Sequence, residues 1–341
     1  MAKTIVAFGY HDQSAPRHWN TGKILQEEGF DIIECHTIKE GFFAKYQDLW
    51  KQFRKKGKRT DAVIVTFPGH YLVPLAWTLT RIPRKHLIFD AFVSLFDTLV
   101  YDRQKYSFWH PFAWFLWLVD YCTCHIADEI WIDTQEHKKY FAKTFFLNPK
   151  RIRVVYLGTR EDLFYPMSSP MCSPQGDTLE ILFYGTYLPL QGIESIIDAA
   201  KILQNKNLPI HFTLIGSGQT YSAMRERAEK YKLKNITFEP RIPYEKLPDR
   251  IRAASLCLGI FGTTAKTKRV IPHKVYDAIG CGIPIITADT PAIREKFTND
   301  KEVILCKAGD AEDLAEKIEK FHALHFFKRK SPIANASMPE Q

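Results

Sequence analysis

Short apolar runs rich in β-branched and aromatic residues alternate with longer stretches of helical spacing along the whole 341-residue chain. This alternation is typical of βαβ units, in which helices connect parallel strands. The predicted strands are residues 4–9, 31–35, 62–67, 86–90, 129–133 and 152–156 in the first half, and 180–184, 211–215, 235–238, 256–260, 284–288 and 302–305 in the second. The pattern predicts an α/β fold with two doubly wound, Rossmann-like domains.

The segment 166–178 separates the two series of strands. It has no hydrophobic periodicity and is rich in Pro, Ser and Gly, which is typical of an exposed connection. We therefore expect a first domain at 1–165, a second at 178–326 and a polar C-terminal tail at 327–341. Ligands of open parallel sheets bind beyond the carboxyl ends of the strands, so two such domains facing a cleft predict a binding site there.

Composition narrows the class of protein. Apolar residues make up 45% and charged residues 25% of the chain, which excludes collagen-like, coiled-coil and low-complexity proteins. The net charge of +9 favours anionic partners, but it is spread over both halves, which argues against nucleic-acid binding. Seven cysteines without a disulfide-like spacing, and an N-terminus that enters an apolar run directly, predict a cytoplasmic protein.

The aromatic segment 108–122 is the nearest approach to a membrane-spanning sequence. It is interrupted by His110, Pro111 and Asp120, and it is shorter than the roughly 20 apolar residues that a span requires. One interpretation is a buried helix that begins at Pro111. The other is an interfacial patch that contacts a membrane surface from the cytoplasmic side.

Two glycine-containing turns follow strands of the second domain. The first contains Gly185, Thr186, Gln191 and Gly192 before a helix, and the second reads Gly216-Ser217-Gly218. Glycines let a phosphate approach the backbone at a helix N-terminus, although ordinary turns contain them as well. The second turn lacks the third Gly of the pattern G-x-G-x-x-G, which weakens a hydride-transfer function.

Positive charge gathers at the end of a later strand. Lys266, Lys268, Arg269 and Lys274 fall within nine positions, just before a Gly-bounded helix. Cations beside a helix N-terminus suit a diphosphate, and a solvated surface run is the alternative. Asp277 lies three residues after Lys274, on the same helix face, where its carboxylate could accept hydrogen bonds from ribose hydroxyls.

Together these motifs resemble the donor-binding half of glycosyltransferase family 4, whose members are retaining, nucleotide-sugar-dependent enzymes with the two-domain GT-B fold. The resemblance rests on the stretches 185–192 and 215–218, on the pattern Pro272-x-Lys274-x-x-Asp277-x-x-x-x-Gly282-x-Pro284, on Arg294-Glu295, and on 153–166, which is like the stretch that closes the family's first domain. It covers nearly the whole chain.

The resemblance also defines departures. Thr186 and Gln191 stand where the family commonly has an Arg and a Lys for the diphosphate, and Arg269 and Asp277 stand at its two-glutamate signature. The resemblance implies that Lys266, Arg269 and Lys274 replace the missing phosphate cations, that Asp277 keeps the ribose role, and that the glycine turns of the second domain, with Ser217, surround the donor.

Polar residues end several strands of the first domain. His70 is a candidate contact to acceptor or donor sugar, with a solvated loop histidine as the alternative. Asp90, Asp97 and Asp102 lie among apolar residues, where a carboxylate needs a partner or a task. Asp90 and Asp97 are candidates for general-base help or for stabilising an oxocarbenium-like centre. Helix capping by Asp97 and pairing of Asp102 with Arg103 are the structural alternatives.

Metal chemistry is not expected. Cys122-Thr-Cys124-His125 lacks a second pair at zinc spacing, and no paired Asp-x-Asp is present to hold a divalent ion against a diphosphate. By the resemblance, the leaving phosphate itself takes the acceptor proton, so that neither a cofactor nor a protein nucleophile is required.

The sequence therefore predicts a cytoplasmic hexosyltransferase that uses a nucleotide diphosphate sugar. By the resemblance, its acceptor is a hydroxyl of a glycan or lipid-linked sugar in cell-envelope polysaccharide synthesis. Two alternatives remain open: a nucleotide-sugar epimerase or phosphorylase of the same fold, and a non-catalytic nucleotide- or glycan-binding module.

Overall fold

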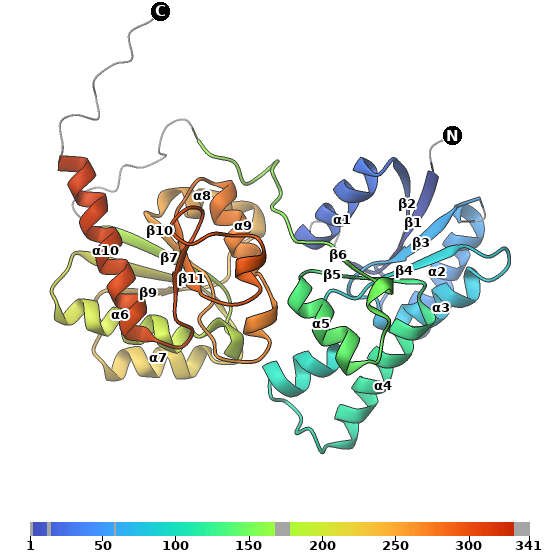
Figure 1. Cartoon of the computed structure of the whole chain (residues 1–341), viewed down its shortest axis with the longest axis horizontal. Coiled ribbons are helices and arrows are strands. Elements are labelled where there is room, and N and C mark those ends of the chain that lie inside the picture. The colour runs from blue at the N-terminus through green and yellow to red at the C-terminus, as the bar shows by residue number, and fades with distance from the viewer. Residues whose placement is uncertain (1–2, 12–14, 58, 168–177, 331–341) are drawn as a thin grey trace, which may run out of the picture. The chain divides into compact units, whose positions relative to one another are not determined.

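The computed structural model describes residues 3–11, 15–57, 59–167 and 178–330, and these form two compact units (Figure 1). Unit 1 consists of the described residues up to 160 together with 268–273, and unit 2 consists of 161–267 and the described residues from 274 onward. Each unit contains one six-stranded sheet whose paired strands are all parallel, with helices between the strands. The predicted α/β fold with two doubly wound domains is confirmed.

Unit 1 has the strand order β2-β1-β3-β4-β5-β6. Its strands and main helices are β1 (Lys3–Gly9), α1 (Pro16–Glu27), β2 (Phe30–His36), α2 (Phe42–Lys56), β3 (Ala62–Val65), α3 (Val73–Leu79), β4 (His86–Asp90), α4 (Pro111–Ile126), β5 (Glu129–Ile132), α5 (Gln135–Thr144) and β6 (Ile152–Val154). Short 3₁₀ helices lie at His70–Leu72 and Pro149–Arg151, and a π-helical turn lies at Asp97–Asp102.

Both faces of the unit 1 sheet are buried. Val6 and Phe8 of β1 pack into the core on one face, and Ile5 and Ala7 pack into a second core on the other. Side chains of a strand alternate between the two faces, so a run without polar residues is what a strand covered on both sides requires. This is why the central strands could be located from apolar runs alone.

Unit 2 has the strand order β12-β11-β10-β7-β8-β9. Its strands and main helices are β7 (Leu179–Thr186), α6 (Ile193–Asn205), β8 (Ile210–Ser217), α7 (Tyr221–Lys230), β9 (Ile236–Glu239), α8 (Leu247–Ala253), β10 (Leu256–Leu258), α9 (His273–Gly280), β11 (Ile285–Ala288), β12 (Ile304–Cys306) and α10 (Ala311–Lys330). Short 3₁₀ helices lie at Pro189–Gln191, Tyr244–Lys246, Thr267–Arg269 and Ile293–Glu295.

Two predicted segments fall largely outside the described residues. Of the predicted connection 166–178, only its ends are described. Of the predicted tail 327–341, the first four residues continue the backbone of helix α10 and the rest lie outside the described ranges. Among the described residues, no helix combines the length and the apolar character that crossing a membrane demands.

Candidate functional site

A pocket of about 330 Å³ opens at the carboxyl edge of the unit 2 sheet. Its walls come from the ends of β7 and β8 and from the segment between β9 and α8. The lining residues are Tyr184, Gly185, Thr186, Ile215, Gly216, Ser217, Gly218, Arg241, Ile242, Tyr244 and Leu247. We call it the β7–β8 pocket. It brings together five of the residues predicted to bind a donor, since both glycine turns contribute to one cavity.

Glycine is required in this wall because two backbone segments pass very close together. Gly216 has φ +138°, and a Cβ on it would lie 1.9 Å from the carbonyl oxygen of Gly185. Gly218 has φ +152°, and a Cβ there would lie 2.7 Å from the backbone nitrogen of Tyr187. The pocket wall is therefore bare backbone, which an anionic ligand can approach closely.

The second glycine of the first turn has a different task. Gly192 adopts the left-handed conformation as the N-cap of α6, and a Cβ on it would lie 2.3 Å from the backbone of Phe261. The amide of Phe261 donates to the carbonyl of Gln191 over 2.9 Å. Gly192 thus lets the loop before α6 pack directly against the loop that follows β10.

Lys274 lies next to the pocket wall and is buried. Its ammonium donates to Oε1 of Gln191 over 2.7 Å and lies 3.8 Å from the ring centroid of Phe183. A Cβ on Gly185 would lie 3.1 Å from Lys274 Nζ, which places the ammonium beside the pocket wall. Burial lowers the pKa of Lys274 well below its ordinary value. An anion bound at this wall would favour the charged form again.

Asp277 and Lys266 are buried in unit 2 without lining the pocket. Asp277 is on α9 with Lys274, as predicted, and its Oδ2 lies 3.5 Å from the hydroxyl of Tyr184, which does line the pocket. Lys266 is only 6% exposed, in the loop after β10. Their roles toward ribose and diphosphate stay predictions.

Arg269 belongs to unit 1 by its contacts, although its neighbours in sequence, Lys266 and Lys274, belong to unit 2. Its guanidinium pairs with Oδ1 of Asp97 over 2.5 Å and lies 4.0 Å from the ring centroid of Tyr140. The described contacts of the Arg269 side chain are thus to a carboxylate and an aromatic ring, and its role as a phosphate cation stays a prediction.

Asp97 and Asp90 are both buried in unit 1 and differ in their pairing. Asp90 is the last residue of β4, and its carboxylate accepts hydrogen bonds from Nε and from a terminal nitrogen of Arg17. The shortest of these contacts is 2.5 Å. Asp97 binds Arg269 through Oδ1, while its buried Oδ2 has no hydrogen-bond partner among the described residues. The N-cap of the π-helical turn is Phe96, so Asp97 is its first residue and not its cap. Asp97 is therefore better placed than Asp90 to accept a proton or a hydrogen bond.

His70 is buried, not a solvated loop residue. Its Nε2 donates to the carbonyl of Val93 over 3.0 Å and lies 3.4 Å from Oδ1 of Asp120. Burial lowers the pKa of His70 to about 4. Asp120 accepts from Ser94 Oγ over 2.7 Å and from two backbone amides, and burial raises its pKa to about 7. These contacts hold the segment after β4, so that His70 has a structural task whether or not it contacts sugar.

Sequence reasoning missed three contributors to these arrangements. Arg17 on α1 neutralises Asp90, Arg241 lies exposed at the pocket after β9, and Asp133 accepts from Nδ1 of His137 over 2.7 Å in a buried pair. Each is a single polar residue in an ordinary helical or loop context. Only Asp133, at the end of a predicted strand, carried a positional signal.

Comparisons with known proteins agree with this geometry. Residues 173–337 match the family model described as "Glycosyl transferases group 1". A chitobiosyldiphosphodolichol beta-mannosyltransferase from Eremothecium gossypii is 24% identical over 333 residues, covering 86% of this chain and 66% of the relative. A putative colanic acid biosynthesis glycosyltransferase, WcaL of Escherichia coli, is 24% identical over 178 residues, covering 51% of this chain and 43% of the relative. The chain thus spans less than two thirds of these relatives.

A solved structure shows the same fold. Anabaena HepE, described as a complex with UDP and glucose, superposes with a TM-score of 0.65 at 12% identity, covering 98% of this chain and 93% of that one. The family match falls on the half of the chain that contains the β7–β8 pocket. The second half of the chain thus matches the model of the group 1 glycosyltransferases, and the chain as a whole has an α/β fold like that of HepE.

Proposed function

We propose that the protein is a metal-independent hexosyltransferase of family 4 type. It transfers a hexosyl unit from a nucleotide diphosphate sugar to a hydroxyl of a glycan or lipid-linked acceptor in cell-envelope polysaccharide synthesis, with retention of anomeric configuration. The observation that carries the proposal is the β7–β8 pocket, where a bare glycine backbone and the buried Lys274 adjoin one cavity.

The pocket suits a nucleoside diphosphate for two reasons. The glycine backbone at the ends of β7 and β8 lets phosphate oxygens approach without a side chain in the way. The ammonium of Lys274, held by Gln191, would stabilise the negative charge that develops as the diphosphate departs, and such preorganised charge is worth several kcal/mol in a transition state. Gln191 thus positions the cation at a place where the family commonly has one.

The acceptor hydroxyl would be activated on unit 1. The unpartnered Oδ2 of Asp97 is buried and can accept a hydrogen bond from that hydroxyl or stabilise positive charge on the sugar ring. In a retaining route the leaving phosphate takes the proton, so that Asp97 needs to orient the hydroxyl without forming a bond to the sugar.

The test is transfer from a panel of nucleotide sugars to glycan and lipid-linked acceptors, with the product linkage read by NMR. We expect transfer that survives EDTA, a product with the anomeric configuration of the donor, and a donor KM about 10-fold higher in Arg241→Gln, which removes the exposed cation at the pocket. The matched control is Arg225→Gln, an exposed arginine on α7 outside the pocket.

Other results would select the alternatives. Nucleotide release with water or phosphate but with no acceptor hydroxyl would favour an epimerase or phosphorylase. Donor binding without turnover on any acceptor would favour a binding module. A product of inverted configuration would contradict retention. This outcome has to be tested because the relative from Eremothecium gossypii is named for a beta linkage.

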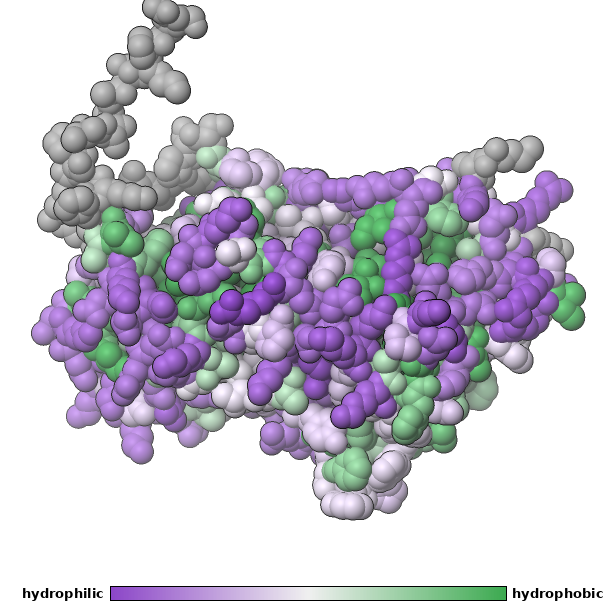
Figure 2. All heavy atoms as spheres, viewed as in Figure 1, coloured by the Kyte–Doolittle hydropathy of each residue, from purple (hydrophilic) through white to green (hydrophobic). Residues whose placement is uncertain are grey.

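A peripheral membrane contact through α4 is part of the proposal. Helix α4 begins at Pro111 and buries one side (Figure 1). Its other side and the segment before it expose large apolar side chains: Trp109, Phe112, Trp114, Phe115 and Leu118. The space-filling view is coloured white to green around the start of this helix (Figure 2). Aromatic side chains suit the headgroup boundary of a bilayer, and a lipid-linked acceptor would be presented at such a surface.

Sedimentation with anionic lipid vesicles tests this contact. We expect the wild-type protein to sediment and the double variant Trp114→Ser, Phe115→Ser to remain in solution. Phe43→Ser, which removes a side chain of α2 that is 84% exposed, is the matched control. Equal sedimentation of all three proteins would contradict a role for α4.

A further inference from the structure

A cluster of two histidines and a carboxylate lies at the carboxyl edge of the unit 1 sheet, apart from the residues discussed above. His11 follows β1, His18 is on α1 and Glu34 is on β2. One nitrogen or oxygen atom of each side chain lies within 4.8 Å of those of the other two. Among the described residues, this is the group of three His, Cys, Asp or Glu side chains close enough together to hold a metal ion. Two imidazoles and one carboxylate form a typical ligand set for a first-row transition metal.

The ligand atoms of the two histidines each lie near an oxygen of Glu34. His11 Nε2 lies 3.5 Å from Glu34 Oε2, and His18 Nε2 lies 3.4 Å from Glu34 Oε1. Ligand atoms that each lie about 2.1 Å from a tetrahedral zinc ion are about 3.4 Å apart. Both histidine–carboxylate separations are longer than good hydrogen bonds and close to this value, each to a different oxygen of Glu34, and one ligand atom from each of the three residues lies within 4.8 Å of the others.

Within the described residues, the two polar atoms that face each other here contact each other at 3.5 Å, too far for a good hydrogen bond. The side chain of His11 is 1% exposed, and both its Nε2 and Glu34 Oε2 lack a hydrogen-bond partner in the described part of the chain. Buried nitrogen and oxygen atoms are nearly always paired, so such a facing pair points to a missing partner. A metal ion that accepts a lone pair from each of these two atoms would be such a partner.

The surroundings orient His11 as they would a metal ligand. Its Nδ1 lies 2.6 Å from Thr66 Oγ1, whose hydroxyl also lies 3.4 Å from the carbonyl of Phe8. If the hydroxyl donates to that carbonyl, its oxygen accepts from Nδ1–H, and Nε2 is left with its lone pair. A hydrogen bond from the second ring nitrogen is the usual support of a metal-bound histidine.

An entry path also exists. A cavity of about 500 Å³ is lined by His18 and Glu34 together with Trp19, Gly22, Lys23, Gln26 and Ile32. The rings of His11 and His18 are stacked, with centroids 3.9 Å apart and planes at 20°. Metal binding therefore requires a ring rotation that makes the lone pairs converge, and the part-exposed His18 has this cavity beside it.

We propose that His11, His18 and Glu34 bind one zinc-class divalent transition-metal ion that links β1, α1 and β2, with a fourth position open to water. The ion ties the start of α1 to the sheet edge and takes no part in donor binding, which the proposed function leaves metal-independent. The proposal uses unit 1 residues only, so it stands or falls separately from the proposed function.

The experiment is a competition titration of Zn²⁺ against a chromophoric chelator, using the full chain after EDTA treatment. We expect one Zn²⁺ per chain in wild type and at least a 100-fold weaker affinity in His18→Gln and in Glu34→Gln. Thr66→Val, which removes the hydroxyl beside Nδ1, should weaken binding 10- to 100-fold. Circular dichroism of each metal-free variant verifies that it is folded.

The matched control is His86→Gln. His86 and Glu129 form another histidine–carboxylate pair of unit 1, with Nε2 and Oε2 3.2 Å apart. Among the described residues, that pair has no third metal-ligating side chain close by. We therefore expect the Zn²⁺ affinity of His86→Gln to equal that of wild type. Loss of zinc in this variant, uptake in His18→Gln and Glu34→Gln equal to wild type, or no uptake by folded wild type would each overturn the proposal.

Cobalt substitution gives a readout that needs no variant. Co²⁺ on two imidazoles and a carboxylate should show weak visible d–d bands of a four- or five-coordinate ion without a thiolate charge-transfer band. An intense near-ultraviolet thiolate band would assign the ion to a cysteine, such as the exposed Cys122, and would contradict the site.

Discussion

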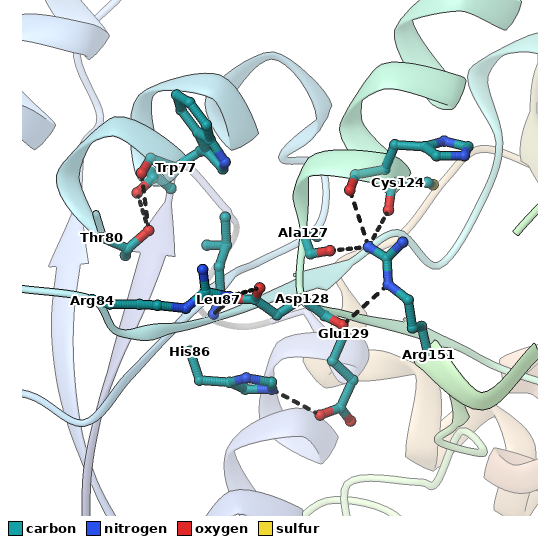
Figure 3. A network of polar contacts seen from close by, with 12 residues as sticks. Trp77, Thr80, Arg84, His86, Leu87, Cys124, Ala127, Asp128, Glu129 and Arg151 are labelled. Atoms are coloured by element: carbon teal, nitrogen blue, oxygen red, sulfur yellow. Dashed lines mark hydrogen bonds and ion pairs between the residues drawn. The ribbon is translucent and has the colours of Figure 1, made fainter. Parts of the chain in front are cut away.

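The two edges of the unit 1 sheet use similar polar residues but differ in how fully those residues are paired. At the amino edge, the guanidinium of Arg151 donates to the backbone carbonyls of Cys124, His125, Ala127 and Asp128 (Figure 3). The carboxylate of Asp128 in turn accepts from the amide of Leu87 and pairs with Arg84. This network ties the starts of β4, β5 and β6 together.

At the carboxyl edge the described structure leaves buried polar atoms without partners. They include His11 Nε2, Asp97 Oδ2 and His137 Nε2. Ligands of open parallel sheets bind at this edge, whereas the opposite edge contributes stability. Arg81 Nε, before β4, also lacks a partner within the described residues, so the distinction holds for the histidines and aspartates of unit 1: their unsatisfied buried atoms lie on the carboxyl side.

The largest effect on stability is expected from Arg151→Ala at the amino edge. It removes the donors of several backbone carbonyls at once, and each orphaned buried group costs about 1–3 kcal/mol. We expect unfolding free energy of unit 1 to fall by about 3 kcal/mol in urea denaturation, with donor KM unchanged. Arg151→Lys, which keeps the charge and one donor group, should recover part of the loss. A fall below about 1 kcal/mol would show that the edge is not held by this network.

Asp97→Asn should affect the reaction instead of the fold. Asparagine keeps an acceptor for Arg269 but removes the negative charge beside the unpartnered oxygen, so we expect kcat to fall about 100-fold, or about 2.7 kcal/mol. The matched control is Asp128→Asn at the amino edge, which should reduce stability and leave kcat unchanged. Equal kcat in Asp97→Asn and wild type would remove Asp97 from the site.

His70→Gln should reduce the loss of folding stability that the protein shows as the pH falls from 7 to 5. Burial holds the pKa of His70 at about 4, below the ordinary 6.5, so the unfolded chain binds protons more readily and stability is lost as pH falls through 6.5. Between pH 7 and pH 5 this one group costs about 2 kcal/mol. Denaturation midpoints at the two pH values should therefore differ less in the variant than in wild type. An equal difference in both proteins would contradict a neutral buried His70.

The smallest effect is expected from Arg84→Ala. Its guanidinium pairs with Asp128 over 2.8 Å, but its side chain is 68% exposed, and solvent screens such pairs. We expect a loss of at most about 0.5 kcal/mol in the same denaturation assay. A loss comparable to that of Arg151→Ala would mean that the exposed pair, and not the carbonyl network, holds the amino edge.

Much of the fold could be predicted because it depends on local patterns. Apolar runs such as 62–67 and 86–90 are continuous in sequence and are buried on both faces, so they mark central strands directly. The two glycine turns were equally visible, because Gly185 and Gly216 lie at the ends of β7 and β8, Gly218 follows β8, and both strands end at one sheet edge. That edge is where the pocket lies.

The partners of charged residues could not be predicted, because they come from distant parts of the chain. Arg17 and Asp90 are separated by 73 residues, and Arg269 and Asp97 by 172. A run of basic residues in sequence therefore did not indicate that Arg269 pairs with a carboxylate in unit 1 while Lys274 lies beside a glycine wall in unit 2.

The central claim is that the β7–β8 pocket binds a nucleoside diphosphate beside Lys274. Titration calorimetry with UDP and GDP, on wild type and on Lys274→Met, tests it most directly. Because an anion at this wall and the ammonium of Lys274 attract each other, the account predicts binding by wild type and about 10-fold weaker binding by Lys274→Met. Binding with the same affinity in both proteins, or no binding of either nucleotide, would contradict it.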